Sequence, residues 1–202
     1  MLVGLDCETT GSIASRHSLV QIGIYLPDGQ QFFAQVGWDA FEADPESLEV
    51  IRMSEDDIRR GPAASDVERD LLAWCEGHGI GDKALVPVGW GVSTFDLPFV
   101  TKTFPEFRKR YLSHRTVELN ALCYALAGVK TYNDELRDFD FWKRTAKWAA
   151  EFEATASMRI TPDWHNAGYD AVTSLLAFEW LRKIMGHPAP SSAKFVLPHN
   201  GP

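Results

Sequence analysis

The sequence predicts an α/β domain in which helices pack on a mixed sheet. Strand-like alternation of apolar and polar residues fills most of the stretch from residue 2 to residue 37, and helical periodicity dominates after residue 97. Strands first, followed by a mixture of strand and helices, are typical of this class. With 202 residues and 45% hydrophobic content the chain can bury one sizeable core, whereas two full domains would be cramped.

The first elements are three predicted strands. Strand-like patterns of apolar residues occur at residues 2–8, 17–26 and 30–37, and the last two surround the sequence PDGQ, which is a turn signal. Short strands joined by a tight turn usually pair with their neighbours in sequence. We therefore expect a three-stranded meander at the start of the chain.

The remaining elements are mostly helical. Residues 65–79 begin with Ser65, carry Glu68 three residues later and close on a glycine, which predicts a helix with a capping box and both ends marked. A buried strand is expected at 84–91, and helices at about 97–111, 116–127, 134–155 and 166–185. We expect one domain over residues 1–186 and a Pro-rich tail over 187–202.

The net charge of −8 disfavours a nucleic-acid partner at first sight, but the charge is unevenly distributed. Residues 42–57 hold seven acids against one arginine, whereas residues 102–115 hold five Lys or Arg against Glu106. The simplest interpretation of either run is a solvated face.

Several classes of protein are disfavoured by the composition. No run of eighteen apolar residues is present, so we expect no membrane span, and the N-terminus lacks the pattern of an export signal. The chain has three cysteines, Cys7, Cys75 and Cys123. Their odd number and the lack of C-x-x-C spacing argue against a disulfide framework and a thiolate zinc site. A reducing, cytoplasmic location fits best.

Asp6 and Glu8 stand at the end of the first predicted strand. Side chains two apart in a strand share a face, so the two carboxylates would lie side by side and repel each other. Such a pair persists when a cation lies between the carboxylates, when one of them holds a proton, or when water screens both. A metal site and a solvated strand end are both open at this point.

Two later segments could complete a carboxylate cluster. Asp96 lies between Phe95 and Leu97 ahead of a helical run, where an acid is either an N-cap or a ligand. His165 and Asp170 bracket the start of the last helix with small residues between them. A surface or capping histidine is the alternative interpretation of His165.

The three segments together are more specific than any one of them. DCETTG, STFDLPF and HNAGYD resemble, in order and rough spacing, the three motifs of the DEDDh family of 3′→5′ exonucleases. The resemblance implies a ribonuclease H-like fold with a mixed five-stranded sheet flanked by helices. Trp90 and Gly91 stand where the family usually carries His-Asn, a departure that bears on substrate contacts or loop shape more than on catalysis.

The resemblance also implies the chemistry. The protein would release nucleoside monophosphates from the 3′ ends of single-stranded DNA or RNA with two Mg²⁺ or Mn²⁺ ions, and the absence of a Cys/His cluster argues against zinc. The four carboxylates of the family would be Asp6, Glu8, Asp96 and Asp170. The general base would be His165. The residues that contact the terminal nucleotide would be Thr9, Thr10 and Phe95. A phosphodiesterase confined to short oligonucleotides and a catalytically inactive binding module remain as alternatives.

Overall fold

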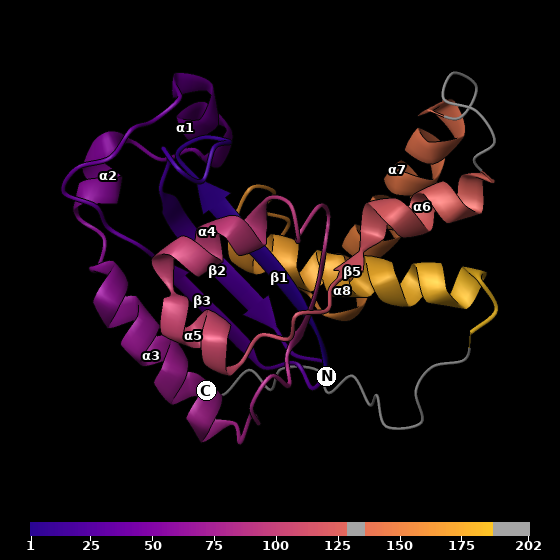
Figure 1. The fold of residues 1–202 in the computed structure, drawn as a ribbon. Coiled ribbons are helices and arrows are strands. Elements are labelled where there is room, and N and C mark those ends of the chain that lie inside the picture. The colour runs from indigo at the N-terminus through magenta and orange to yellow at the C-terminus, as the bar shows by residue number, and fades with distance from the viewer. Residues whose placement is uncertain (129–135, 188–202) are drawn as a thin grey trace.

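The computed structural model describes residues 1–128 and 136–187, which form a five-stranded mixed sheet with helices on both faces (Figure 1). The strand order is β3-β2-β1-β4-β5, so β1 lies in the centre. β2 runs antiparallel to β1 and β3, whereas β4 runs parallel to β1 and β5. The strands are β1 (Leu2–Thr9), β2 (Leu19–Tyr25), β3 (Gln31–Gln35), β4 (Val86–Gly89) and β5 (Val117–Glu118). The predicted meander and the mixed five-stranded sheet are confirmed.

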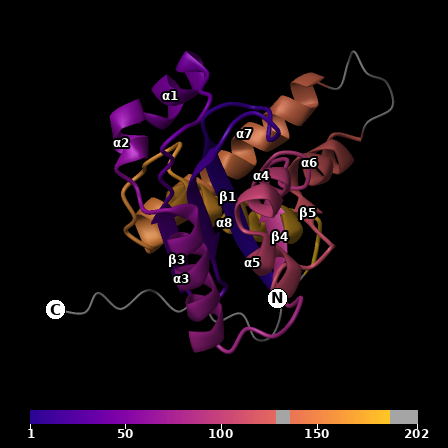
Figure 2. The same ribbon diagram turned by 60° about the vertical axis from the view of Figure 1, so that its left-hand side comes forward.

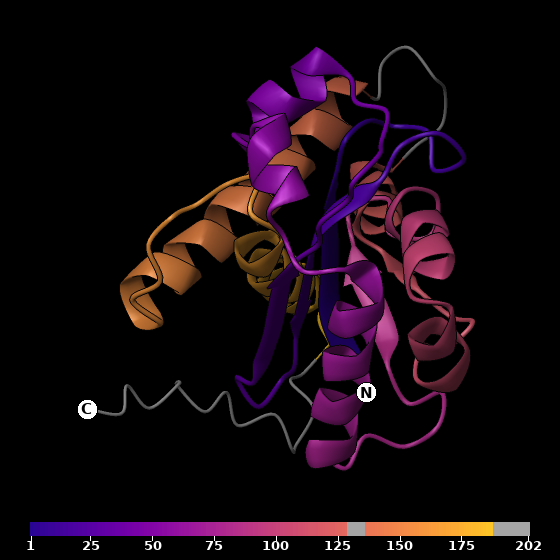
Figure 3. The ribbon, with the colours of Figure 1, turned by 90° about the vertical axis from the view of Figure 1, so that its left-hand side faces the viewer.

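The helices form one layer on each side of the sheet (Figure 2 and Figure 3). One face is covered by α3, α4 and α5, and the other by α7 and α8, while α1 and α2 lie at the end of the sheet away from the N-terminus. The helices are α1 (Pro45–Ile51), α2 (Glu55–Arg59), α3 (Ala64–Gly77), α4 (Asp96–Thr103), α5 (Pro105–Arg110), α6 (Leu119–Ala127), α7 (Leu136–Phe152) with the π-turn η1 (Glu153–Ser157), and α8 (Ala167–Ile184).

Helix α8 lies very close to the central strands, and two glycines permit this. A Cβ atom added at Gly4 would lie 1.8 Å from the carbonyl oxygen of Ala171, and one added at Gly23 would lie 2.0 Å from that of Ala167. Only a residue without a side chain fits there. Because side chains alternate along a strand, the face of β1 that carries Gly4 toward α8 also carries Asp6 and Glu8.

The opposite face of β1 belongs to the main hydrophobic core. Leu5 and Cys7 are buried there together with residues of the covering helices such as Leu71 and Phe99. A second cluster between the sheet and α7 and α8 includes Val88, Ala146 and Leu175. The alternation of β1 thus separates an apolar side, which holds the strand in place, from an acidic side.

The capping box predicted for α3 is wrong. The helix begins at Ala64, after Ala63, so Ser65 lies within the helix. Glu68 instead accepts hydrogen bonds from the backbone N–H groups of Glu106 and Phe107, at 2.8 and 3.0 Å. Its carboxylate therefore caps the N-terminus of α5, an acceptor role that depends on tertiary packing.

The acidic run at 42–57 is more structured than a solvated face. It contains α1, whose first residue is a proline, and α2, where Ser54 and Asp57 form a reciprocal capping box. Ile51 and Ile58 of these helices are buried with Val20. The acids face water while one apolar side packs on the domain.

The predicted helix at 97–111 is also divided. It forms α4 and α5, which are separated at Phe104 because Pro105 starts a new helix.

The predicted tail falls, except for its first residue, at 188–202, outside the described residues. Cys7, Cys75 and Cys123 are buried and unpaired. Among the described residues, no helix is long and apolar enough to cross a membrane.

Candidate active site

The site is built around the end of β1. Asp6 is half-buried and Glu8 is buried, both on the side of the strand that faces α8. The register of β4 on β1 runs from Leu2 to Gly4, so the part of β1 that carries the two acids extends past its parallel neighbour. On the other side, the pairing with β2 continues to Thr9, with an irregularity in the ladder between Glu8 and Thr9. Backbone groups of β1 in this region are therefore open to other partners.

Asp96 takes up one of these groups. The backbone N–H of Cys7 donates a hydrogen bond of 2.8 Å to Oδ1 of Asp96, which is the first residue of α4 and only 3% exposed. This acceptor role is long-range, so Asp96 is not the N-cap that local sequence allowed; that position is Phe95. Burial raises the pKa of Asp96 to about 7, and the hydrogen bond from Cys7 opposes the rise.

Asp170 and His165 come from the start of α8. Asn166 caps this helix by accepting hydrogen bonds from the backbone N–H groups of Gly168 and Tyr169. The backbone N–H of His165 donates a hydrogen bond of 2.9 Å to Oδ2 of Asp170. His165 itself has φ of +63°, a conformation that few residues other than glycine adopt and that is found preferentially at functional sites. In this turn the imidazole of His165 lies near the acids, and the neighbouring residue Asn166 caps the helix.

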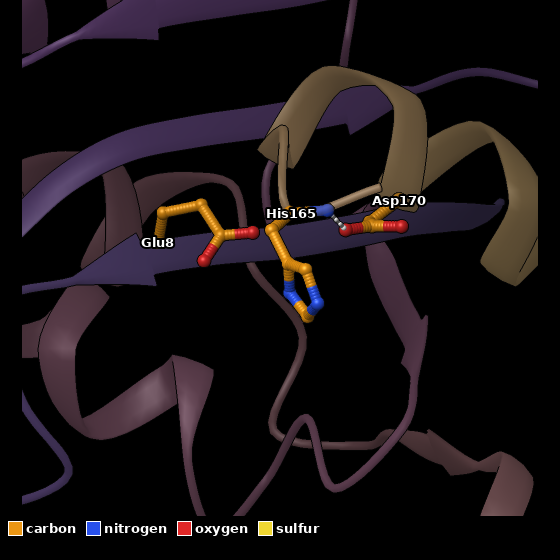
Figure 4. Close-up of side chains that lie close together, drawn as sticks. All are labelled: Glu8, His165 and Asp170. Atoms are coloured by element: carbon orange, nitrogen blue, oxygen red, sulfur yellow. Dashed lines mark hydrogen bonds between the residues drawn. The ribbon is translucent and has the colours of Figure 1, made fainter. Parts of the chain in front are cut away.

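Three of the predicted residues meet directly. Ligand atoms of Glu8, His165 and Asp170 all lie within 4.8 Å of one another. Figure 4 shows the Glu8 carboxylate directed toward the side of His165, with Asp170 beyond it. The charges of Asp96, Asp170 and Glu8 all act on Asp6, which places the fourth acid in the same cluster.

The acids repel one another strongly. Burial raises the pKa of Asp6 well above its ordinary value, and the three neighbouring carboxylates raise it further. Burial, Asp170 and Asp96 raise the pKa of Glu8 to about 8, and burial raises the pKa of Asp170 to about 6. Such a group of oxygen donors, with too little positive charge around it, matches the ligand set of a hard divalent cation such as Mg²⁺ or Mn²⁺.

A pocket of about 330 Å³ adjoins the cluster at Glu8. Thr9 and Phe95 line it, as does α1 through Ser47, Val50 and Ile51. Thr10 does not line it: this side chain is fully buried, and its hydroxyl donates to the carbonyl oxygen of Glu42 at 2.6 Å. Of the three residues predicted to contact substrate, two therefore reach the pocket.

Three charged residues near the site were not singled out from the sequence. Arg52 donates to Oδ1 of Asp163 at 3.0 Å and to the carbonyl oxygen of Trp164, next to His165. The carboxylate of Glu118 accepts from the backbone N–H of Ser93 at 2.7 Å and so supports the loop before Asp96. Lys147 of α7 is half-buried and lowers the pKa of Asp170. Only Arg52 carried a signal, as the single base within an acidic run.

Comparison with known proteins gives matches in structure and none in sequence: no family model matches the chain, and neither does any curated protein. The zinc-bound form of the E. coli exonuclease I complex with single-stranded DNA has a TM-score of 0.60 at 14% identity, over 91% of this chain and 40% of that one. E. coli exonuclease I with a dT13 oligonucleotide has a TM-score of 0.58 at 15% identity, covering 90% and 40%. Exonuclease X in complex with 5′ overhanging duplex DNA has a TM-score of 0.51 at 18% identity, covering 96% and 98%.

The fold is ribonuclease H-like. At these identities the likeness concerns the arrangement of the sheet and its helices, which agrees with the fold predicted from the three motifs. The chain spans about 40% of the length of exonuclease I and nearly all of exonuclease X. The matching region is therefore one part of exonuclease I and almost the entire chain of exonuclease X.

Proposed function

We propose that this protein is a metal-dependent 3′→5′ exonuclease of the DEDDh type, which hydrolyses the terminal phosphodiester bond of single-stranded DNA or RNA and releases nucleoside monophosphates. The observation that carries the proposal is the convergence of four acids and one histidine from three distant segments at the end of β1. The fold shared with exonucleases I and X, both solved in complex with DNA, supports it.

The acids suit the metal ions that this chemistry uses. Asp6, Glu8, Asp96 and Asp170 would hold two divalent cations, which when bound place positive charge beside the phosphoryl oxygens and the departing 3′ oxygen. All four are oxygen donors, and the cluster includes only one imidazole, so Mg²⁺ or Mn²⁺ fits better than zinc. The raised pKa values of Glu8 and Asp96 are what such a donor set shows before a cation neutralises it.

His165 is assigned as the general base. Its backbone N–H is engaged by Asp170, while within the described parts of the chain its imidazole ring makes no hydrogen bond. A ring nitrogen is therefore available to accept the proton of the attacking water. The exposed position of the side chain at the edge of the cluster lets water reach it.

The pocket beside Glu8 is assigned to the terminal nucleotide. Its volume of about 330 Å³ is at the lower end of the range of small-ligand sites, and α1 forms one wall. Phe95 offers an aromatic face on which a base can stack, and Thr9 adjoins the acids. A walled pocket of this size next to the cluster favours a chain end over the middle of a strand.

End-labelled substrates test the proposal. DNA and RNA strands labelled at the 5′ end should shorten progressively in Mg²⁺, and strands labelled at the 3′ end should release labelled mononucleotide first. A 3′-phosphate should block the reaction because it adds bulk and charge at the pocket. Cleavage of a covalently closed circle would contradict an exonuclease.

A further inference from the structure

Lys147 of α7 occupies an unusual position beside the acids. Its ammonium lies between two indole rings, 5.5 Å from the centroid of Trp90 and 5.6 Å from that of Trp164. The ammonium of Lys143, one helical turn earlier, lies 5.8 Å from the centroid of the same Trp90 ring. Two lysines and two tryptophans thus form a cationic rim along the side of the cluster that α7 covers.

The ammonium of Lys147 is close to the acids without pairing with them. Its charge lowers the pKa of both Asp6 and Asp170. Within residues 1–128 and 136–187, however, Lys147 makes no hydrogen bond or ion pair. A lysine ammonium has three donors, and this half-buried one keeps all three open. Burial and the charge of Lys143 lower the pKa of Lys147, while the charges of Asp170 and Asp6 oppose this shift.

The two indoles hold the lysine in place. Trp90 directly follows β4, and Trp164 directly precedes His165. The ring of Trp164 packs edge-on against Tyr169 at 5.1 Å, which fixes it to the first turn of α8. The lysine therefore contacts two of the three segments that supply the cluster: the one that leads to Asp96 and the one that carries His165 and Asp170.

We propose that Lys147, held between Trp90 and Trp164, binds a phosphate group of the nucleic-acid strand beside the carboxylate cluster. The inference rests on the proposed nuclease function and adds to it a contact that none of the three motifs contains. Four carboxylates repel a phosphodiester, so a strand that approaches them needs positive charge on the protein side. A lysine serves phosphate as a point charge, and open donors on a half-buried ammonium provide a charge-assisted hydrogen bond.

Binding of a short fluorescent oligothymidylate in saturating Ca²⁺, which should bind but support little turnover, tests the role of the charge. Lys147→Gln should raise Kd about tenfold or more, the effect of one lost charge-assisted contact. It should also reduce the slope of log Kd against log salt by about 0.7, the value for one phosphate of a single strand. Lys147→Arg should retain most of the affinity. Lys183→Gln removes the same charge from the exposed far end of α8 and should change neither quantity.

Neutral linkages locate the contact. A single methylphosphonate placed in turn at each linkage near the 3′ end should weaken binding to the wild type at several positions. In Lys147→Gln one of these penalties should disappear, because its partner is already gone. Identical penalties in both proteins, or an unchanged Kd in Lys147→Gln, would overturn the proposal. A wild type that neither binds nor cleaves the strand would instead overturn the nuclease function on which it rests. If Lys147→Gln does not fold, Lys147→Met, which lacks the charge and keeps an unbranched side chain between the two indoles, is measured in its place with the same outcomes.

Discussion

The backbone N–H of Cys7 donates a hydrogen bond of 2.8 Å to Oδ1 of Asp96, across 89 residues of sequence. This bond attaches the start of α4 to β1 at the residue between Asp6 and Glu8. The side chain of Cys7 is buried in the main core, so the strand that receives Asp96 is itself fixed. The geometry of the acids therefore depends on backbone groups as much as on the acidic residues themselves.

The raised pKa values predict that the metal-free protein loses stability as pH rises. In the unfolded chain Asp and Glu titrate near pH 4, whereas burial and neighbouring charges raise the folded pKa of Asp170 to about 6, of Asp96 to about 7 and of Glu8 to about 8. Between pH 4 and 8 the folded state binds more protons, so the free energy of unfolding falls with pH. One pKa unit corresponds to ~1.4 kcal/mol, so these shifts predict a loss of at least about 3 kcal/mol.

Thermal unfolding in EDTA at pH 5 and pH 8 measures this loss. We expect a lower Tm at pH 8, and we expect Mg²⁺ to raise Tm more at pH 8 than at pH 5. A Tm that is constant or rises over this range in EDTA would contradict the assigned electrostatics.

Asp6→Asn should separate stability from activity. Burial and three neighbouring carboxylates raise the pKa of Asp6, so removing its charge should raise the Tm of the metal-free protein at pH 8. The same change should reduce cleavage by at least about 10²-fold, since a group that stabilises the transition state electrostatically is lost. Asp39→Asn, at an exposed position, is the matched control and should change neither. Near-normal turnover in Asp6→Asn would remove this residue from the metal site.

Arg52 should act as a positioning residue for His165. It holds Asp163 and the backbone of Trp164 from the C-terminal end of α1, 111 and 112 residues away. Arg52→Ala should slow single-turnover cleavage about tenfold by misplacing the histidine. Stability should change by less than about 1 kcal/mol, because both partners of the ion pair are exposed. Asp163→Asn should have a similar effect, and the double variant should be no slower than either; fully additive losses would refute the coupling.

The close approach of α8 to β1 predicts a large effect of a single methyl group. Gly4→Ala should destabilise the fold by at least about 2 kcal/mol, because the new Cβ would lie 1.8 Å from the backbone oxygen of Ala171. Gly77→Ala is the control: nothing lies within 4 Å of the added atom in α3, so stability should be unchanged or rise by up to about 1 kcal/mol. Denaturant titration of the wild type and both variants gives their free energies of unfolding. If Gly4→Ala were as stable as the wild type, α8 could shift away from β1 at no cost.

Local patterns in the sequence were sufficient for much of the fold. The alternation in residues 2–37 and the PDGQ turn predict the antiparallel part of the sheet, because a meander uses contacts between neighbours in the chain. The long apolar pattern of α8 is likewise local. Within the candidate site, the spacing of Asp6 and Glu8 on a strand was enough to place both on one face.

What the sequence did not show depends on distant partners. Ser65 and Glu68 have the spacing of a capping box, but the carboxylate is used by α5, some 38 residues later. The acidic run at 42–57 contains two short helices that the sequence did not predict, because each has only one buried residue to mark it. Lys147 and Arg52 reach the site only because α7 and α1 are folded beside it, and no periodicity encodes that approach.

The most direct test of the account is single-turnover cleavage of a 5′-labelled single strand by the wild type and by His165→Asn in saturating Mg²⁺. Asparagine tolerates the φ of +63° at this position, so the variant keeps the turn that places Asp170 while losing the proton acceptor. We predict that EDTA abolishes cleavage by the wild type and that His165→Asn is slower by about 10²–10⁴-fold with unchanged affinity for the strand. Wild-type turnover in His165→Asn, or full activity in EDTA, would contradict the assignment of this cluster as a metal-dependent nuclease site.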